Sequence, residues 1–267
     1  MDMKKKERAE IVSQEELSQG IYSLVLRTSI AEDVRAGQFV SLFERDESHL
    51  MPRPISVCQT NRAEGTLRLV YRVAGQGTDA FSKMKPHHYV DILGPLGNGF
   101  PLEKAAGRRV LLMGGGIGIP PMLSCAEAFA EAEEEQKPSA VTFAVGYRTD
   151  DKYLYEDLVE TAPVLVATDD GTFGTHGTVI DAVRAAKVRA DVVFACGPRP
   201  MLRAIKTFAE DREMECYVSM EERMACGVGV CLGCVCKTVD VNHHSQVKNA
   251  RVCKDGPVFN AEEVDLT

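Results

Sequence analysis

The hydrophobic positions of the first part of the chain lie in short runs with a period of two, separated by Gly and Pro. These runs are IYSLVLRT (21–28), GQFVSLF (37–43), RPISVCQT (53–60), GTLRLVYRV (65–73) and HHYVDILGP (87–95). Short strands at regular intervals, broken by turn residues, are typical of an antiparallel barrel or sandwich. We therefore expect residues 1–102 to form an antiparallel β-barrel domain.

The pattern then changes, and apolar strands alternate with helical segments. The strand candidates are RRVLLMGGG (108–116), AVTFAVGYR (140–148), PVLVATDDG (163–171) and VVFACGP (192–198). The helix candidates are PMLSCAEAFAEAEEE (121–135), LYEDLVE (154–160), VIDAVRAA (179–186) and RPMLRAIKTFAEDRE (199–213). This alternation predicts a parallel sheet covered by helices, which we assign to residues 103–214. Residues 215–267 are Cys-rich and irregular, so the predicted fold class is α/β plus all-β with a small third domain.

Charge and composition narrow the classes of partner. A formal net charge of -8 argues against a nucleic-acid surface or an anionic membrane surface, because both select for a basic face. No run approaches the roughly 18 apolar residues of a membrane span, and the basic N-terminus has no apolar stretch behind it. We therefore expect a cytoplasmic protein that binds neither nucleic acid nor membrane, and whose nine cysteines form no structural disulfides.

Five of the nine cysteines lie between Cys226 and Cys253, and four of them have the spacing of an iron–sulfur site. The order Cys226-x4-Cys231-x2-Cys234, with Cys253 after eighteen further residues, is typical of a plant-type 2Fe-2S loop. The glycines of the loop allow positive φ and let amides point at sulfur. A structural zinc site is the alternative, although zinc knuckles favour paired C-x2-C units. Cys236 could compete with Cys253 for the fourth position, because a strand would place Cys234 and Cys236 on one face.

A second candidate site follows the first apolar strand of the α/β region. GGGIGIPP (114–121) leads into a helix whose first amides could receive a pyrophosphate, although such a turn can also be a plain tight connection. Two other strands end in ATDDG (167–171) and FACGPRPM (194–201), and the strand ends of one parallel sheet open on one crevice. An acidic strand end suits ribose hydroxyls and repels a 2′-phosphate, which favours NAD over NADP unless the aspartates are only solvated turn residues. The candidate residues are Gly114, Gly115, Gly116, Gly118, Asp169, Cys196, Gly197 and Pro198.

A third candidate site is RPIS (53–56) in the β-rich part, followed by YRVAGQGT (71–78). An arginine can bind phosphate through two hydrogen bonds, and a nearby hydroxyl can hydrogen-bond the edge of a flavin ring. The alternative is that RPIS is only an edge strand that begins after prolines.

These three motifs, in this order, resemble the ferredoxin-reductase superfamily with a C-terminal ferredoxin-like cluster loop. Within it, MEERMACGVGVCLGCVCKT and the later VCKDGPVF are similar to the electron-transfer subunits of NAD-linked (class 1B) dihydroorotate dehydrogenase. The small subunits of NADPH-linked ferredoxin and sulfide oxidoreductases share this layout, and such a subunit is the alternative function. They typically have an aspartate in place of the first cysteine, where this chain has Cys226.

The resemblance implies an oxidoreductase subunit with three cofactors: FAD, a 2Fe-2S cluster and NAD. It implies FAD contacts at Arg53, Pro54, Ile55, Ser56, Val70, Tyr71, Arg72, Gly77 and Thr78, and cluster ligation by Cys226, Cys231, Cys234 and Cys253. With four thiolates available, His243 and His244 are expected to be solvated loop residues.

The resemblance also implies a partner. In this hypothesis dihydroorotate is oxidised at FMN in a separate catalytic subunit, and electrons cross the cluster and FAD to NAD+ in pyrimidine biosynthesis. A flavin is needed because hydride transfer moves two electrons whereas the cluster accepts one. No general base for dihydroorotate oxidation is identifiable here, and the chain is too short to add a barrel domain of about 250 residues. A partner subunit is therefore required, and the resemblance implies a heterotetramer with two copies of each chain.

Overall fold

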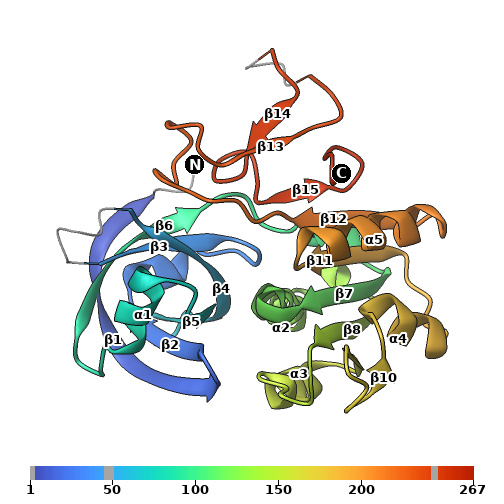
Figure 1. Ribbon diagram of the computed structural model, residues 1–267, viewed down its shortest axis with the longest axis horizontal. Coiled ribbons are helices and arrows are strands. Elements are labelled where there is room, and N and C mark those ends of the chain that lie inside the picture. The colour runs from blue at the N-terminus through green and yellow to red at the C-terminus, as the bar shows by residue number, and fades with distance from the viewer. Residues whose placement is uncertain (1–3, 45–50, 242–245) are drawn as a thin grey trace.

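The computed structural model describes residues 4–44, 51–241 and 246–267 (Figure 1). Its N-terminal part is a closed antiparallel barrel with the strand order β1-β2-β5-β4-β3-β6, which confirms the predicted barrel. The strands are β1 (Lys5–Ser18), β2 (Ile21–Arg27), β3 (Phe39–Phe43), β4 (Arg53–Asn61), β5 (Thr66–Arg72) and β6 (Tyr89–Leu96). A 3-10 helix, η1 (Ser29–Glu32), follows β2, and helix α1 (Gln76–Ser82) follows β5.

Strand β1 has no counterpart among the apolar runs of the sequence. Most of its side chains are polar or charged, and Ala9 and Ile11 are the two that are buried, each with 0% exposure. A strand with one face in solvent needs few apolar residues, so hydrophobic runs alone do not reveal it.

The interior of the barrel holds an aromatic group around Tyr71. Its ring stacks on Tyr22 with centroids 5.9 Å apart and meets Phe81 of α1 edge-on at 6.5 Å. Tyr71 is 1% exposed, and burial raises the pKa of its hydroxyl. The side chain of Tyr71 is therefore part of the barrel core.

The second part is a seven-stranded sheet with the order β10-β9-β8-β7-β11-β12-β15, in which β7 to β12 run parallel. The strands are β7 (Arg109–Gly115), β8 (Ala140–Tyr147), β9 (Val164–Thr168), β10 (Thr175–His176), β11 (Val192–Cys196), β12 (Glu215–Ser219) and β15 (Val258–Asn260). The helices are α2 (Ile119–Glu131), α3 (Tyr155–Thr161), α4 (Val179–Ala185) and α5 (Arg199–Glu210), with short 3-10 turns η2 (Leu102–Ala105), η3 (Gly116–Gly118) and η4 (Glu134–Gln136). The predicted α/β domain is confirmed.

The helices cover both faces of this sheet. Helices α2 and α3 share a core with the side of the barrel, whereas α4 and α5 pack on the opposite face. The chain runs outward from β7 through β8 and β9 and then returns to β11 on the other side of β7. The strand order therefore reverses between β7 and β11, and in open α/β sheets ligands bind at this switch point.

The last strand of the sheet comes from the C-terminal region. Strand β15 pairs antiparallel with β12, with Ser219 opposite Val258. The chain therefore leaves the sheet after Ser219 and returns at Val258 beside the strand it left. The described residues between these points, 220–241 and 246–257, form a lobe with strands β13 (Val235–Lys237) and β14 (Asn249–Arg251). Because the sheet continues past residue 214, the division of the chain at residues 102 and 214 stays a prediction.

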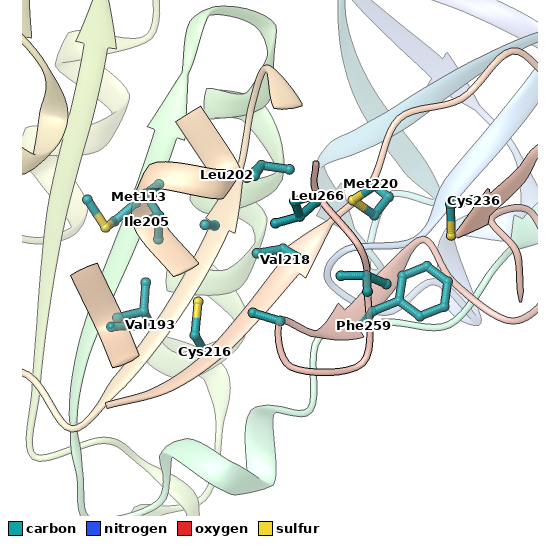
Figure 2. Close-up of a cluster of buried hydrophobic side chains, with 14 of the residues drawn as sticks. Met113, Val193, Leu202, Ile205, Cys216, Val218, Met220, Cys236, Phe259 and Leu266 are labelled. Atoms are coloured by element: carbon teal, nitrogen blue, oxygen red, sulfur yellow. The ribbon is translucent and has the colours of Figure 1, made fainter. Parts of the chain in front are cut away.

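The lobe shares a hydrophobic core with the face of the sheet that α5 covers. Met220, Phe259 and Leu266 connect this core to the buried Cys236 of the lobe (Figure 2). The lobe is thus packed against the α/β domain through side chains as well as through strand pairing.

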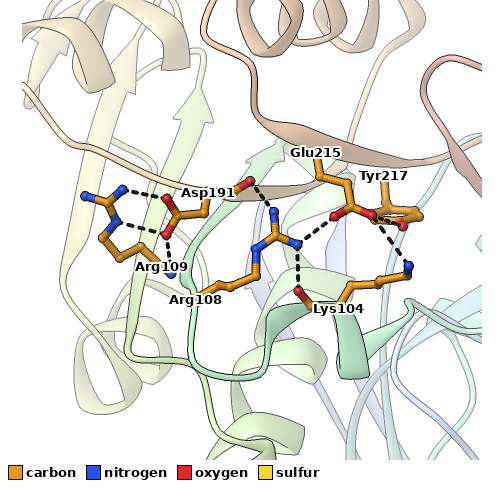
Figure 3. A network of polar contacts seen from close by, with 6 residues as sticks. All are labelled: Lys104, Arg108, Arg109, Asp191, Glu215 and Tyr217. Atoms are coloured by element: carbon orange, nitrogen blue, oxygen red, sulfur yellow. Dashed lines mark hydrogen bonds and ion pairs between the residues drawn. The ribbon is translucent and has the colours of Figure 1, made fainter.

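Ion pairs join the amino-terminal ends of the central strands, at the edge of the sheet opposite the switch point (Figure 3). Arg109 Nε and Asp191 Oδ2 are 2.9 Å apart, and Arg108 Nη1 donates to Glu215 Oε2 at 2.6 Å. These contacts join the starts of β7, β11 and β12.

Among the residues that the structure describes, every helix is too short or too polar to span a bilayer.

Candidate functional site: three adjoining cofactor sites

The glycine loop after β7 packs directly against the loop after β11. The pairing of these strands places Gly114 opposite Cys196. A Cβ atom on Gly118 would lie 2.2 Å from the carbonyl oxygen of Cys196, and one on Gly115 would lie 2.3 Å from Met201 Sδ. A side chain on Gly118 would clash with backbone, whereas Met201 could move away from one on Gly115. Gly118 therefore allows the starts of α2 and α5 to meet at the switch point of the sheet.

The other residues predicted for this site lie along the same edge. Gly197 packs on Met201 Sδ, where a Cβ would come within 2.9 Å, and Pro198 is exposed beside it. Asp169 is exposed after β9, with one strand, β8, between its strand and β7. Burial raises the pKa of the Cys196 thiol to about 12, so this thiol is not an anionic nucleophile at neutral pH.

The flavin motif forms a cationic corner on the barrel. The guanidinium of Arg53 lies over Gly77 at the start of α1, where a Cβ would come within 2.5 Å of Arg53 Nε. Thr78 Oγ1 accepts a hydrogen bond from the Ala74 amide at 2.9 Å and donates to the Gly75 carbonyl at 3.0 Å, which closes the turn into the helix. Glycines at the start of α1, Gly75 and Gly77, leave its backbone amides open, and amides beside a guanidinium fit a pyrophosphate.

The remaining predicted flavin residues differ in how exposed their side chains are. Pro54, Ile55 and Ser56 are partly exposed, although they lie in a strand of a closed barrel. Val70 is buried in the core shared with α2. The side chain of Tyr71 points into the barrel, so a contact of Tyr71 with FAD would have to come from its backbone.

Arg72 joins the two sites. Its side chain is exposed, and Nη2 lies 3.3 Å from the position of a Cβ on Gly116 in the glycine loop. The cation therefore extends from the flavin strand β5 toward the start of α2. Sequence reasoning assigned Arg72 to the flavin alone and could not reveal this second contact.

The cysteine loop is arranged to stabilise a thiolate at its first position. Cys226 Sγ accepts hydrogen bonds from three backbone amides, those of Val228, Val230 and Cys231, at 3.4, 3.3 and 3.4 Å. Positive φ angles at Gly227 (67°) and Gly229 (87°) make this turn possible. Partial burial opposes ionisation, but the amides outweigh it and lower the pKa of the Cys226 thiol to about 6.

The other thiols complete two pairs. Cys231 is exposed and its amide donates to Cys226 Sγ, while the amide of buried Cys253 donates to Cys234 Sγ at 3.4 Å. Burial and the neighbouring Cys234 raise the pKa of Cys253 to about 12. Arg251 holds the two segments together, because it donates to Gly229 O at 3.2 Å and pairs with Asp255.

These residues fit a 2Fe-2S cluster, because thiols in two pairs and amides directed at sulfur are the donor set of such a site. Within the described ranges no three Cys, His, Asp or Glu side chains already meet in a metal-binding arrangement. Cys236 is 4% exposed in the core of the lobe, and burial raises the pKa of its thiol to about 11. His243 and His244 lie outside the described residues.

The cysteine loop meets the flavin strand across one barrel strand. Gly227 lies over Ser41 of β3, with 3.1 Å between Ser41 Oγ and a Cβ placed on Gly227. Ser41 is in turn the register partner of Pro54 in the RPIS motif. The candidate cluster site and the candidate flavin site are therefore neighbours.

Asn98 clamps the segment that follows Cys253 to the barrel. Its Nδ2 donates to the carbonyls of Val258 (2.7 Å) and Asp255 (3.3 Å), and its Oδ1 accepts from the Val258 amide at 2.9 Å. The signal in the sequence was only an Asn in a Gly-rich turn, so this contact was missed.

Comparison with known proteins identifies three cofactor-binding domains in the same order along the chain. Three family models match in succession: "Oxidoreductase FAD-binding domain" at residues 8–100, "Oxidoreductase NAD-binding domain" at residues 112–207, and "Iron-sulfur cluster binding domain of dihydroorotate dehydrogenase B" at residues 221–265. The electron transfer subunit of dihydroorotate dehydrogenase B (NAD(+)) from Geobacillus sp. (strain WCH70) is 40% identical over 99% of this chain and 100% of its own length. The chain belongs to this family of electron-transfer subunits.

Other relatives support the same family and fold. The corresponding subunit from Bacillus caldolyticus is 40% identical over 98% of this chain and 99% of its own length. A solved structure of an NADH-dependent reduced ferredoxin-NADP oxidoreductase superposes with a TM-score of 0.84 at 30% identity, over 97% of this chain and 90% of that one. The ferredoxin NADP+ reductase from Neisseria gonorrhoeae, at 17% identity and a TM-score of 0.66 over 78% of this chain and 91% of that one, shares the fold. As an electron-transfer subunit of the family, the chain is an oxidoreductase subunit with FAD-, NAD- and iron–sulfur-binding domains, as predicted.

Proposed function

We propose that this chain transfers electrons from the oxidation of dihydroorotate, carried out at FMN in a catalytic partner subunit, to NAD+. The observation that supports this most directly is the contact of the cysteine loop with β3, whose Ser41 pairs with Pro54 of the flavin motif. When bound, FAD can exchange two electrons with the nicotinamide and single electrons with the cluster. The chain itself contributes positions and charges: thiols, cations and glycine-lined loops.

The residues proposed for each cofactor follow from these positions. Arg53 and the start of α1 bind the FAD pyrophosphate, and Ser56 lies on the exposed strand beside them. The glycine loop and the Cys196-Gly197-Pro198 segment bind NAD, with Arg72 between the two dinucleotides. Cys226, Cys231, Cys234 and Cys253 hold the cluster.

The exposed surface of the lobe is proposed as the docking surface for the catalytic subunit. Val230 and Leu232 flank the exposed thiol of Cys231 and are 79% and 61% exposed. Four more exposed apolar residues belong to the same lobe: Val235, Val239, Val241 and Val247. Exposed apolar side chains in one small lobe are typical of an interaction surface, and Val230 and Leu232 belong to the cysteine loop itself. Pairing of two copies of each chain is part of the proposal, as is a cytoplasmic location, which the nine free thiols favour.

The docking surface can be tested by placing a charge on it. Leu232→Glu should weaken binding of the catalytic subunit by at least about tenfold, because a carboxylate at an apolar interface is costly to desolvate. Val159→Glu, at a 41% exposed position on α3, is the matched control and should bind normally. Binding is measured by calorimetry with the holo-protein, and equal affinities for the two variants would place the interface elsewhere.

The function is tested by anaerobic co-purification with the candidate FMN-containing subunit, followed by an assay of dihydroorotate-dependent NAD+ reduction with iron and flavin analysis. Cys226→Ala should lose the iron and the coupled activity but keep FAD. Cys236→Ala is the matched control, since Cys236 is a fifth thiol of the same lobe, and it should keep both. If Cys236→Ala loses iron while Cys253→Ala keeps it, the fourth cluster ligand is Cys236 and not Cys253.

The likeness to the reduced ferredoxin-NADP oxidoreductase favours a second candidate, a subunit that exchanges electrons with ferredoxin. The same preparation distinguishes them. NADH formation with ferredoxin and none with dihydroorotate would keep the three sites and change the donor.

A further inference from the structure

Ser41 lies in the middle of β3 with its side chain on the outer face of the barrel. Its neighbours Val40 and Leu42 belong to the barrel core, so alternation along the strand directs Ser41 the other way. Phe39, on the same face as Ser41, belongs to the core that contains the buried cysteines of the lobe. Ser41 therefore faces the lobe, under Gly227 of the cysteine loop.

This hydroxyl is buried without a partner. Ser41 is 0% exposed, and its Oγ has no hydrogen-bond partner in the described part of the chain. Leaving a buried hydroxyl unsatisfied costs free energy, whereas alanine at this position would cost none. An unsatisfied polar group of this kind indicates an acceptor that the polypeptide does not supply.

The nearby protein sulfur does not serve as this acceptor. Cys226 Sγ is already the acceptor for three amides, and it lies outside hydrogen-bonding distance of Ser41 Oγ. The positive φ of Gly227 turns the loop so that no side chain separates Ser41 from it. The group that the cysteine loop itself would hold at this place is a 2Fe-2S cluster, whose inorganic sulfides are anionic acceptors.

We propose that the Ser41 hydroxyl donates a hydrogen bond to an inorganic sulfide of the cluster and stabilises its reduced, more negative form. This hydrogen bond raises the reduction potential of the cluster, and it reaches the cluster from β3, the strand that pairs with the flavin strand β4. This inference rests on the cluster assigned under the proposed function and adds a residue outside the cysteine loop.

The test compares side chains that differ only in the hydroxyl. Ser41→Ala removes it, and Ser41→Thr and Ser41→Val form a pair of equal shape of which only Thr keeps it. Ser23→Ala is the matched control, because Ser23 is a buried barrel serine whose Oγ accepts from Arg68 instead. The reduced fraction of the cluster is measured by electron paramagnetic resonance at a fixed potential, on the holo-protein.

At the midpoint of the wild type, Ser41→Ala and Ser41→Val should show a ratio of reduced to oxidised cluster about fivefold lower, as expected for one hydrogen bond. Ser41→Thr should stay nearer to the wild type, and Ser23→Ala should be unchanged. In D2O, a coupled exchangeable deuteron seen by pulsed resonance in the wild type and in Ser41→Thr should be missing in Ser41→Ala.

The outcomes separate this inference from the proposed function. A wild type with two irons per chain and an unchanged ratio in Ser41→Ala overturns the inference and leaves the function intact. A wild type without iron overturns the cluster assignment and the inference with it. If Ser41→Ala fails to assemble the cluster, assembly by Ser41→Thr and not by Ser41→Val supports the hydroxyl, whereas equal failure of both overturns it.

Discussion

The Asn98 clamp predicts that one side chain of the barrel controls how firmly Cys253 is held. Asn98→Ala removes three hydrogen bonds, two to Val258 and one to Asp255, in a part-buried position. At about 0.5–1.5 kcal/mol net for each bond, the loss should be about 2–4 kcal/mol, and the Val258 amide and carbonyl lose the side chain that bonds them. The backbone bond from the Asn98 amide to Gly256 O, at 2.7 Å, remains.

Two measurements check this prediction. Urea unfolding of the holo-protein gives the free energy of unfolding, and the rate of iron release to a chelator reports opening of the segment that carries Cys253. A loss of about 3 kcal/mol in local stability corresponds to roughly a hundredfold faster release. The control is Asn61→Ala, which removes one bond to the Glu64 amide in an exposed turn and should change stability by about 0.5 kcal/mol or less. Equal stability and equal release rates in the two variants would refute the role of the clamp.

Three further outcomes are expected. Gly118→Ala should weaken NAD binding and lower stability by about 1–3 kcal/mol, because its methyl group would meet the Cys196 carbonyl, whereas Gly75→Ala, where nothing lies within 4 Å, should bind NAD normally in a titration. Hydrogen bonds from Arg109 lower the pKa of Asp191 from 3.8, so the pair stabilises the fold above that pH and the contribution is lost as the pH falls. In Asp191→Asn the free energy of unfolding should therefore decline less steeply in acid. A decline as steep as in the wild type would contradict the assignment. Removal of iron should make the thiols of Cys226 and Cys231 reactive toward a thiol reagent in the folded protein, while the buried thiols of Cys234 and Cys253 stay protected.

Much of the architecture follows from local patterns, because alternation and turn residues act over a few neighbours. The strands that carry RPIS and YRVAGQGT, and the βα unit around the glycine loop, begin and end within a few residues of the predicted positions. Strand β15 was missed because three residues are too few to show a period, and its pairing with the edge strand β12 joins segments about forty residues apart. Strand β1 was missed because its outer face is charged.

The residues of the candidate sites also fall into those that the sequence predicted and those that it did not. Spacing along the chain predicted the cysteine loop, since its ligands are close in sequence. Ser41 and Asn98 carried no such signal, because their roles depend on segments that lie far away along the chain. Tyr71 shows the opposite case: the motif was found, but the parity of the strand directs the ring into the barrel.

The return of the chain from the lobe to β15 makes the lobe an insertion between two paired strands of the sheet. Ser219 and Val258 are paired residues of neighbouring strands, and antiparallel partners lie about 4.5–5.5 Å apart. A hairpin turn of about two to five residues could therefore replace residues 220–257 without moving either end. What would remain is the barrel and the α/β domain, with the face around Val218 and Phe259 uncovered where the lobe now packs. The same cut site offers protein engineers a place to exchange one redox module for another, on condition that the new module covers this apolar face.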